Sequence, residues 1–437
     1  MRKHTPFLAI LAGYFLVAGL FAIRVPAWQA PDEPAHYNVV RQIAENGCCP
    51  VIQSGDWDSA FLDQLKQQKF APALLGQITA VEYEDHQPPL YYLLLAPVYS
   101  LSGGSLTALR LASVVIGAGV VLAAYAVALR AFRGKYGVAY AAAAFVAFLP
   151  QHVHILASVN NDALALALTG AILWASIDYA DGGRTPAWAL GLLVGAALLT
   201  KSTAYLMGGV AFISILIRPL VPNPSGAVVG TPYMATARRL AAFLVPASIL
   251  GALWWLRNFT VYGFPDFLGL RAHDLVVVGQ LRTADYIADV GLAQYASNAL
   301  QTTVTSFYGQ FGWMALPLPV WALGALLAVT VVGLASAAFN PARKLAARGT
   351  WRVFGLTAFL SVAMLVYYNT SFVQFQGRYV YPLLIPLAVT VALGLDILRH
   401  RLPFVRALPW LNAAALSLVA VLDVWLLWRV IVPNLTP

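Results

Sequence analysis

The sequence predicts an all-α membrane protein that crosses the bilayer many times, and two observations support this fold class. Hydrophobic residues make up 60% of the chain and charged residues only 10%, whereas a soluble domain carries about a quarter charged residues. Apolar segments also recur with close to the roughly twenty residues that a helical span needs. We expect one integral membrane domain over residues 1–437 with eleven spans, at 7–25, 106–129, 137–157, 161–178, 186–200, 203–217, 239–256, 317–339, 353–370, 379–398 and 409–432.

The first span sets the expected orientation. It follows the basic start Met-Arg-Lys-His, and no small-x-small cleavage site comes after it, so we interpret it as a retained span. With the N-terminus in the cytoplasm, most Lys and Arg residues fall on cytoplasmic connections, which include 218–238 and 340–352. This is the positive-inside pattern. We therefore expect a multi-pass protein of the plasma (inner) membrane with its C-terminus outside. The net charge of +9 then reports orientation and does not indicate a nucleic-acid partner.

Two long connections are expected on the extracytoplasmic side, at residues 26–105 and 257–316. Within the first, 33–46 and 58–68 have the mixed polar and apolar composition of short amphipathic helices lying on the membrane. Residues 89–101 are apolar but too short to cross, and Pro97 interrupts them, so we expect a re-entrant helix in the outer leaflet.

The second connection is expected to hold one helix over 284–304. Cys48 and Cys49 are adjacent and have no metal-ligand spacing. Because neighbouring cysteines rarely pair, we assign them no role.

The unusual polar residues collect on the extracytoplasmic side of this topology. An acid there can act as general base toward a hydroxyl, carboxylates and imidazoles can hold a divalent metal such as Mg²⁺ or Mn²⁺, and Lys or Arg can bind phosphate. The combination indicates transfer of a group carried on a lipid phosphate. The candidates are Asp32, Glu33 and Asp162 for catalysis, His86, Gln87, Lys201, Arg257, Gln376, Arg378 and Tyr379 for donor binding, and Asp32, Asp162 and His86 for a metal.

Each candidate also has a structural alternative. Asp32 and Glu33 could mark only the point where the chain reaches water, and Asp162 could cap the fourth span. Lys201 could extend from a short span to the interface. His86 could be a turn residue, and Arg378 could contact lipid headgroups.

Several motifs resemble the GT-C superfamily of membrane glycosyltransferases. Asp32-Glu33 after the first span, HQPPLYY at 86–92 and Asn161-Asp162 after the third span resemble protein O-mannosyltransferases, aminoarabinose transferases and oligosaccharyltransferase catalytic subunits. LPQHVHILASVNNDA (149–163), LLTKST (198–203), SFYGQFGW (306–313) and QFQGRYVYP (374–382) are similar to a related family of bacterial membrane proteins of unassigned function.

The resemblance implies a polyprenyl-phosphate sugar donor and an acceptor reached from the extracytoplasmic side. It implies that Asp32 is the general base or a metal-facing carboxylate and that Asp162 is the acid of the second outer turn. His86 stands where some relatives carry an acidic metal ligand.

Two other functions fit some of these features. A transporter or flippase of a lipid-linked saccharide would place ionisable residues in mid-membrane and often shows inverted repeats, but the spans here are nearly free of charge and no repeat is visible. A non-catalytic envelope-assembly protein that binds the lipid carrier would keep the phosphate-binding residues but could lose the acid. The presence of Asp32 and Glu33 favours the enzyme.

Overall fold

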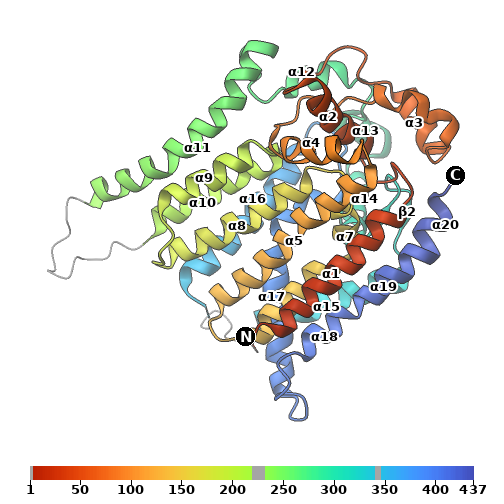
Figure 1. The fold of residues 1–437 in the computed structure, drawn as a ribbon. Helices are drawn as coiled ribbons and strands as arrows, with labels where there is room; N and C mark the ends of the chain where they lie inside the picture. The colour runs from red at the N-terminus through yellow and green to blue at the C-terminus, as the bar shows by residue number, and fades with distance from the viewer. Residues whose placement is uncertain (1–2, 219–231, 340–345) are drawn as a thin grey trace.

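The computed structural model describes residues 3–218, 232–339 and 346–437. It is a helical bundle in which residues 26–105 and 257–316 cover one end, which we call the loop end (Figure 1). The described strands are β1 (Gln310–Phe311) and β2 (Leu316–Pro317), which pair antiparallel. Most of the predicted cytoplasmic connection 218–238 and part of 340–352 lie outside the described residues.

Eight described helices are long and apolar enough to cross a bilayer, which confirms the predicted fold class. Six are single helices near predicted spans, and one of these, α11, extends beyond its predicted span at both ends. Two more are composite: residues 377–401 join the 3-10 turn η4 to α17, and residues 411–435 join α18 to α20 through a short π-helical turn. The single ones are α1 (Thr5–Arg24), α5 (Leu106–Ala131), α8 (Asp162–Ala180), α11 (Pro232–Tyr262), α15 (Val320–Ala338) and α16 (Arg348–Tyr368); the composite ones contain η4 (Gly377–Leu383), α17 (Leu384–Arg401), α18 (Leu411–Ser417), α19 (Val419–Leu426), η5 (Leu427–Ile431) and α20 (Val432–Leu435).

The predicted span 137–157 is broken, which corrects the expectation of one continuous helix. It consists of α6 (Tyr136–Ala147) and α7 (Pro150–Leu156), bent by 65°. Pro150 has no N–H, so it cannot donate to the Val146 carbonyl four residues earlier. That carbonyl instead accepts a hydrogen bond from His152 Nδ1 (2.8 Å). The imidazole therefore replaces a backbone donor at the break.

The predicted spans 186–200 and 203–217 form two short helices, α9 (Ala187–Leu198) and α10 (Leu206–Ile217), separated by the 3-10 turn η2 (Ser202–Tyr205). Each has 12 residues, or about 18 Å of helix, against about 30 Å of hydrocarbon. The count of eleven crossings therefore stays a prediction. The two chain termini lie at opposite ends of the bundle (Figure 1), which suits an odd number of crossings.

The first connection contains the helices that the sequence predicts. They are α2 (Glu33–Asn46) and α3 (Ser59–Gln67), the latter capped by Asp58, whose side chain accepts from Phe61 N. A 3-10 turn, η1 (Pro72–Ala80), follows. The apolar segment is α4 (Leu90–Ser102), 13 residues long and packed on α2 and α5 near the loop end (Figure 1). It is too short to cross a bilayer as a helix.

The second connection departs from its prediction. The expected helix 284–304 is two helices, α13 (Thr283–Val290) and α14 (Leu292–Tyr308), preceded by α12 (Leu270–Val276). Gly291 separates the pair with a backbone φ of +81°, a left-handed conformation that glycine adopts without steric cost and that a helix does not accommodate. The periodicity of the apolar residues continues across this break and conceals it.

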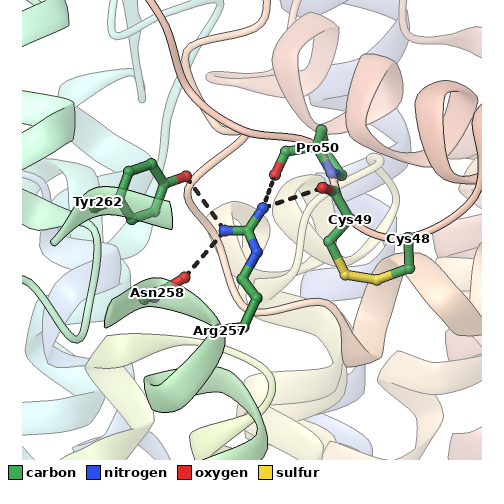
Figure 2. Close-up of a disulfide and its surroundings, with 6 residues drawn as sticks. All are labelled: Cys48, Cys49, Pro50, Arg257, Asn258 and Tyr262. Carbon is green, nitrogen blue, oxygen red and sulfur yellow. Dashed lines mark hydrogen bonds between the residues drawn. A yellow bond between two sulfur atoms is a disulfide. The ribbon is translucent and has the colours of Figure 1, made fainter. Parts of the chain in front are cut away.

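Cys48 and Cys49 form a disulfide with each other (Figure 2), contrary to the expectation that they are unpaired. The bonded pair follows the turn at Gly47, which ends α2. Arg257, near the end of α11, donates hydrogen bonds to the carbonyl oxygens of Cys49 (3.0 Å) and Pro50. The two long connections are thereby linked at this point.

Candidate active site

A cavity of about 260 Å³ lies at the loop end, between the two long connections and the ends of α16 and η4. Most of the ionisable side chains in its wall come from segments far apart in the sequence. Tyr368 and Tyr379 form part of its aromatic wall. The ionisable groups that line it are Asp32, His36, Glu84, His86, Lys201, His273 and Arg378.

Asp32 is a carboxylate of this cavity that is held in place by two hydrogen bonds. It precedes α2 with a left-handed φ of +66°, and its two oxygens accept hydrogen bonds from Tyr83 OH (2.9 Å) and Arg378 Nη2 (2.5 Å). Burial alone would raise its pKa, but the charge of Arg378 and these two hydrogen bonds outweigh burial, and the pKa falls to about 2. Asp32 is therefore ionised at neutral pH.

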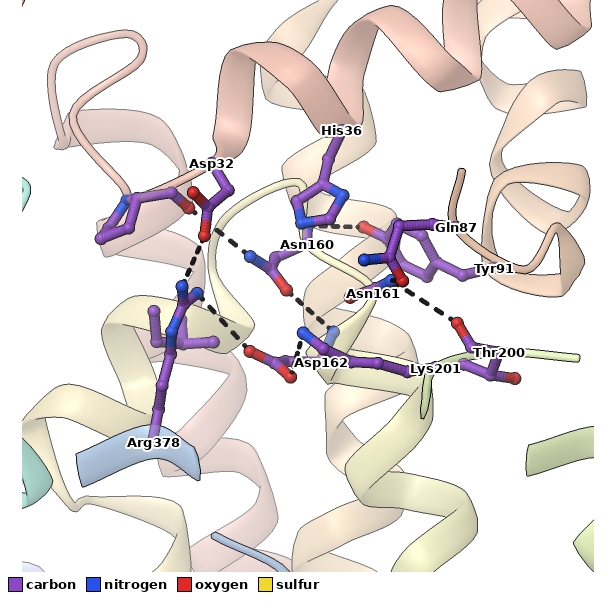
Figure 3. A network of polar contacts seen from close by, with 12 residues as sticks. Asp32, His36, Gln87, Tyr91, Asn160, Asn161, Asp162, Thr200, Lys201 and Arg378 are labelled. Carbon is purple, nitrogen blue, oxygen red and sulfur yellow. Dashed lines mark hydrogen bonds and ion pairs between the residues drawn. The ribbon is translucent and has the colours of Figure 1, made fainter. Parts of the chain in front are cut away.

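Arg378 lies between two acids (Figure 3). It pairs with Asp32, and its Nη1 lies 3.6 Å from Asp162 Oδ2. The other oxygen of Asp162 is 2.7 Å from Lys201 Nζ. Two positive and two negative side chains therefore alternate across the site, which explains how an arginine with a side-chain exposure of 4% is tolerated at the end of an apolar helix.

Asp162 is the first residue of α8, and its carboxylate binds these two cations. The turn before it is held from several sides. Asn160 N donates to Tyr91 OH (2.9 Å), and the Asn161 amide donates to Gln87 Oε1 (3.3 Å) and Tyr92 OH (3.2 Å). The HQPPLYY stretch therefore positions the turn that precedes Asp162.

Glu33 does not line the cavity. It is fully buried and pairs with Arg110 of α5 through two contacts, at 2.7 and 2.6 Å. Its oxygens also accept from Trp28 N and Val159 N, each at 3.1 Å. These contacts give Glu33 a structural role, whereas the adjacent Asp32 faces the cavity.

Asp32, His36 and Glu84 each offer a ligand atom, and these atoms lie within 4.8 Å of one another. His36 Nδ1 contacts Tyr92 OH at 2.8 Å, which leaves Nε2 for a ligand. Burial, followed by the charge of Asp32, raises the pKa of Glu84 to about 8, and burial lowers the pKa of His36 to about 3. The predicted metal set of Asp32, Asp162 and His86 shares only Asp32 with this group.

His86 and Gln87 line the cavity as predicted candidates for donor contact. The His86 ring lies 4.4 Å from that of His273 in α12, so the two long connections meet here. Burial, then the neighbouring His273, hold the pKa of His86 well below its usual range. The Gln87 amide donates to Glu84 Oε2 at 2.7 Å.

The other donor-binding candidates divide into two groups. Tyr379 lines the cavity with its ring 5.5 Å from the Arg378 guanidinium. Gln376 and Arg257 do not line it; Arg257 holds the carbonyls after the disulfide (Figure 2). Gly377, beside Arg378, allows α14 to pack closely, because a Cβ there would overlap the backbone of Thr303 and Phe307.

Four residues with notable positions in the structure, His36, Glu84, Arg110 and His273, are absent from the candidates predicted from the sequence. His36 stands four residues after Asp32 at the start of a predicted helix, a spacing that places side chains on one face. Arg110 lies inside a predicted span, where an ionisable residue indicates a function or a buried partner. Glu84 and His273 carry no comparable local signal.

Comparison with known proteins agrees with this architecture. Residues 86–255 match a family model described as dolichyl-phosphate-mannose-protein mannosyltransferase. The structure is also similar to the crystal structure of ArnT from Cupriavidus metallidurans bound to undecaprenyl phosphate, with 15% identity and a TM-score of 0.53 over 99% of this chain and 74% of that one. The chain has the GT-C fold.

Two further structures support the same GT-C fold. ArnT from the same organism in the apo state gives 15% identity and a TM-score of 0.52, over 99% of this chain and 74% of that one. The Archaeoglobus fulgidus oligosaccharyltransferase, solved with Zn and sulfate, gives 14% identity and a TM-score of 0.50, over 96% of this chain and 52% of that one. No curated protein matches the sequence.

Proposed function

We propose that this GT-C protein is a glycosyltransferase that moves a sugar from a polyprenyl-phosphate-linked donor to an acceptor on the extracytoplasmic side of the membrane. The observation that carries the proposal is the ionised Asp32 carboxylate in one cavity with Arg378 and Lys201. The family match and the solved neighbours, which are glycosyltransferases, support it. The undecaprenyl phosphate bound by ArnT supports a lipid-phosphate partner.

In the proposed reaction, an acceptor hydroxyl oxygen attacks the anomeric carbon of the donor sugar. The bond from that carbon to the phosphate oxygen breaks, and its electron pair leaves with the lipid phosphate. The acceptor proton passes to Asp32. Because the pKa of Asp32 is low, the carboxylate accepts this proton late, when the new bond has made the acceptor oxygen acidic.

Arg378 and Lys201 are the proposed partners of the donor phosphate. Within the described residues, Arg378 Nε and Nη1 are buried and make no hydrogen bond, although Nη1 lies 3.6 Å from Asp162 Oδ2. In the proposed complex, the guanidinium turns these donors to phosphate oxygens. The Lys201 ammonium has three donors, and among the described residues it pairs with Asp162. Charge that develops on the leaving phosphate would be stabilised here. Asp162 keeps both cations in place before the donor binds.

Asp32, His36 and Glu84 would hold a divalent metal if the enzyme uses one. Two carboxylates and one imidazole suit Mn²⁺ or Zn²⁺, and Mg²⁺ less well because of the nitrogen ligand. A bound metal would supply positive charge beside the donor phosphate. Binding requires Glu84 to lose its proton.

A transfer assay in proteoliposomes tests the proposal. The purified protein is supplied with polyprenyl-phosphate sugars labelled in the sugar, and the label is followed into membrane and soluble acceptors. We expect transfer by the parental protein and by Asp289→Asn, which changes an exposed acid of α13, and loss of transfer in Asp32→Asn. Labelled lipid that crosses the bilayer without transfer would identify a flippase instead. Donor binding without transfer in any acceptor fraction would identify a carrier-binding protein.

A further inference from the structure

A second cavity, of about 400 Å³, lies within the first long connection, away from the bundle. We call it the outer pocket. It is formed by the start of α3, the turn before it, the second half of η1 and the segment after η1. Its volume falls within the roughly 300–1,000 Å³ of small-molecule sites. The lining side chains that can contact a ligand through polar groups or aromatic rings include Asp56, Trp57, Asp58, Phe61, Gln77 and Tyr83.

The aromatic residues of the outer pocket are held in place by contacts on its far side. Trp57 Nε1 donates to Val278 O of the second connection (2.9 Å), and its ring meets the Tyr83 ring edge-on at 5.1 Å between centroids. The indole N–H is therefore already used, and the ring contributes apolar surface to the pocket. Fixed aromatic surface of this kind can pack against the C–H face of a sugar ring.

The polar residues of the outer pocket keep unused hydrogen-bonding capacity. Asp56 uses one carboxylate oxygen for Gln53 N (2.7 Å), and Asp58 uses one for Phe61 N (2.9 Å). Among the described residues, the second oxygen of each and the Gln77 side-chain amide have no hydrogen-bond partner. Carboxylate oxygens accept and an amide both donates and accepts, which matches the hydroxyl groups of a saccharide.

The charge of the outer pocket restricts its ligand. Two carboxylates line it, and none of its lining residues, all of which belong to the described range 55–83, is basic. An anionic sugar would meet two negative charges without compensation. A neutral sugar would find hydrogen-bond acceptors, and the ammonium group of an amino sugar would find an opposite charge.

Tyr83 connects the outer pocket with the active site. Its ring lines the pocket, and its hydroxyl donates to Asp32. We propose that the outer pocket binds a neutral or amino saccharide unit and that this unit belongs to the acceptor, an assignment that rests on the glycosyltransferase function proposed above. A glycan held there lies one side chain away from the carboxylate that accepts the acceptor proton.

Calorimetric titration of the purified full-length protein with three trisaccharides of matched length tests the ligand class. The probes are the glucosamine trimer, its N-acetylated form and the galacturonic acid trimer. We expect the glucosamine trimer to bind most tightly, the N-acetylated trimer to bind more weakly, and the galacturonic acid trimer not to bind. Equal binding of all three, tightest binding of the anionic trimer, or binding of none would overturn the proposal.

Amide substitutions then locate the site. Asp56→Asn with Asp58→Asn removes both charges while leaving a carbonyl oxygen to accept from Gln53 N and Phe61 N, so the fold is retained. We expect the affinity for the glucosamine trimer to fall by roughly tenfold or more, as for loss of a charge-assisted hydrogen bond. Asp63→Asn makes the same change on an exposed position of α3 outside the pocket and should leave binding unchanged. Unchanged binding in the double variant would refute the assignment.

Asp32→Asn separates this inference from the proposed function. Trisaccharide binding should persist in that variant although transfer is lost. Normal binding by a parental protein that transfers no sugar would count against the function and leave the saccharide site standing. Sugar transfer by a parental protein that binds none of the trisaccharides would support the proposed function and refute the saccharide site.

Discussion

The Glu33 carboxylate and the Arg110 guanidinium form a two-pronged ion pair with both side chains buried. Glu33 also accepts from Trp28 N, before Asp32, and from Val159 N, before Asp162. One carboxylate therefore joins α5 to the segment before Asp32 and to the segment before Asp162. We therefore expect this pair to help hold Asp32 and Asp162 on either side of Arg378.

Glu33→Gln should destabilise the protein and slow transfer. The substitution leaves Arg110 buried without its counter-charge, which typically costs about 3–5 kcal/mol. Thermal unfolding and turnover measure the two effects. Adding Arg110→Met should recover part of the stability but not the turnover, because the anchors of the two acidic segments are still weakened. Glu45→Gln alters an exposed ion pair and should change stability by less than about 1 kcal/mol. An unfolding temperature of Glu33→Gln equal to that of the parental protein would contradict this structural role of Glu33.

Asp32→Asn should lower turnover by roughly 10²–10⁴-fold, the range for loss of a positioned base. The amide keeps the size of the side chain and can still accept from Tyr83 or Arg378, so donor affinity should change far less. Single-turnover kinetics with labelled donor separate the two quantities. Turnover at the parental rate in a folded Asp32→Asn protein would eliminate Asp32 as the base.

Arg378→Lys should weaken donor use, and Arg378→Ala should weaken it further. Lysine keeps the charge but loses the planar contact that reaches two oxygens at once. Donor titrations should show a loss of roughly tenfold for each such contact removed. Arg271→Ala, an exposed position in α12, serves as the control. If Arg378 contacted only lipid headgroups, the lysine variant would bind donor with the parental affinity.

Mn²⁺ binding should strengthen as pH rises through about 8. Glu84 is protonated below its pKa of about 8 and must lose that proton to bind metal, so affinity should rise about tenfold per pH unit up to this value and then level off. Asp32 and His36, with pKa values of about 2 and 3, release no proton in this window. Glu84→Gln should weaken binding and remove the slope, which calorimetry at several pH values measures. A flat profile in the parental protein would exclude Glu84 as a ligand.

Cysteine probes at the two ends of α5 test the orientation. Ser105→Cys, at the loop end, should react with an impermeant thiol reagent in intact cells, whereas Arg133→Cys should react only after the membrane is opened. The native pair contributes no free thiol, since Cys48 and Cys49 are bonded to each other. The opposite pattern would show that α4 crosses and that every later connection is inverted.

The fold was predictable where local chemistry determines it. Composition predicted the membrane class, and the mixed polar and apolar residues of 58–68 predicted the helix that the structure shows as α3. The errors arose where an apolar run conceals an interruption: Pro150 divides one predicted span, and Gly291 divides one predicted helix. A hydropathy profile averages over such single residues.

The sequence predicted which residues belong to the site better than it predicted which of them contact one another. Asp32, Asp162, Lys201 and Arg378 were assigned to one side of the membrane, and the structure brings them together. Their pairing depends on tertiary packing across hundreds of residues, which no local pattern reports. The adjacent acids Asp32 and Glu33 illustrate this limit, because their different environments follow from the positions of Arg378 and Arg110.

Gly377 links the second connection mechanically to the active site. The α14 backbone packs where a side chain would stand, and Ser306 Oγ accepts from Gly377 N (2.8 Å). The next residue along the chain is Arg378. A shift of α14 would therefore move the backbone beside Arg378 and disturb its ion pair with Asp32. The close contact at one glycine thus couples the packing of an extracytoplasmic helix to the charge balance of the candidate site.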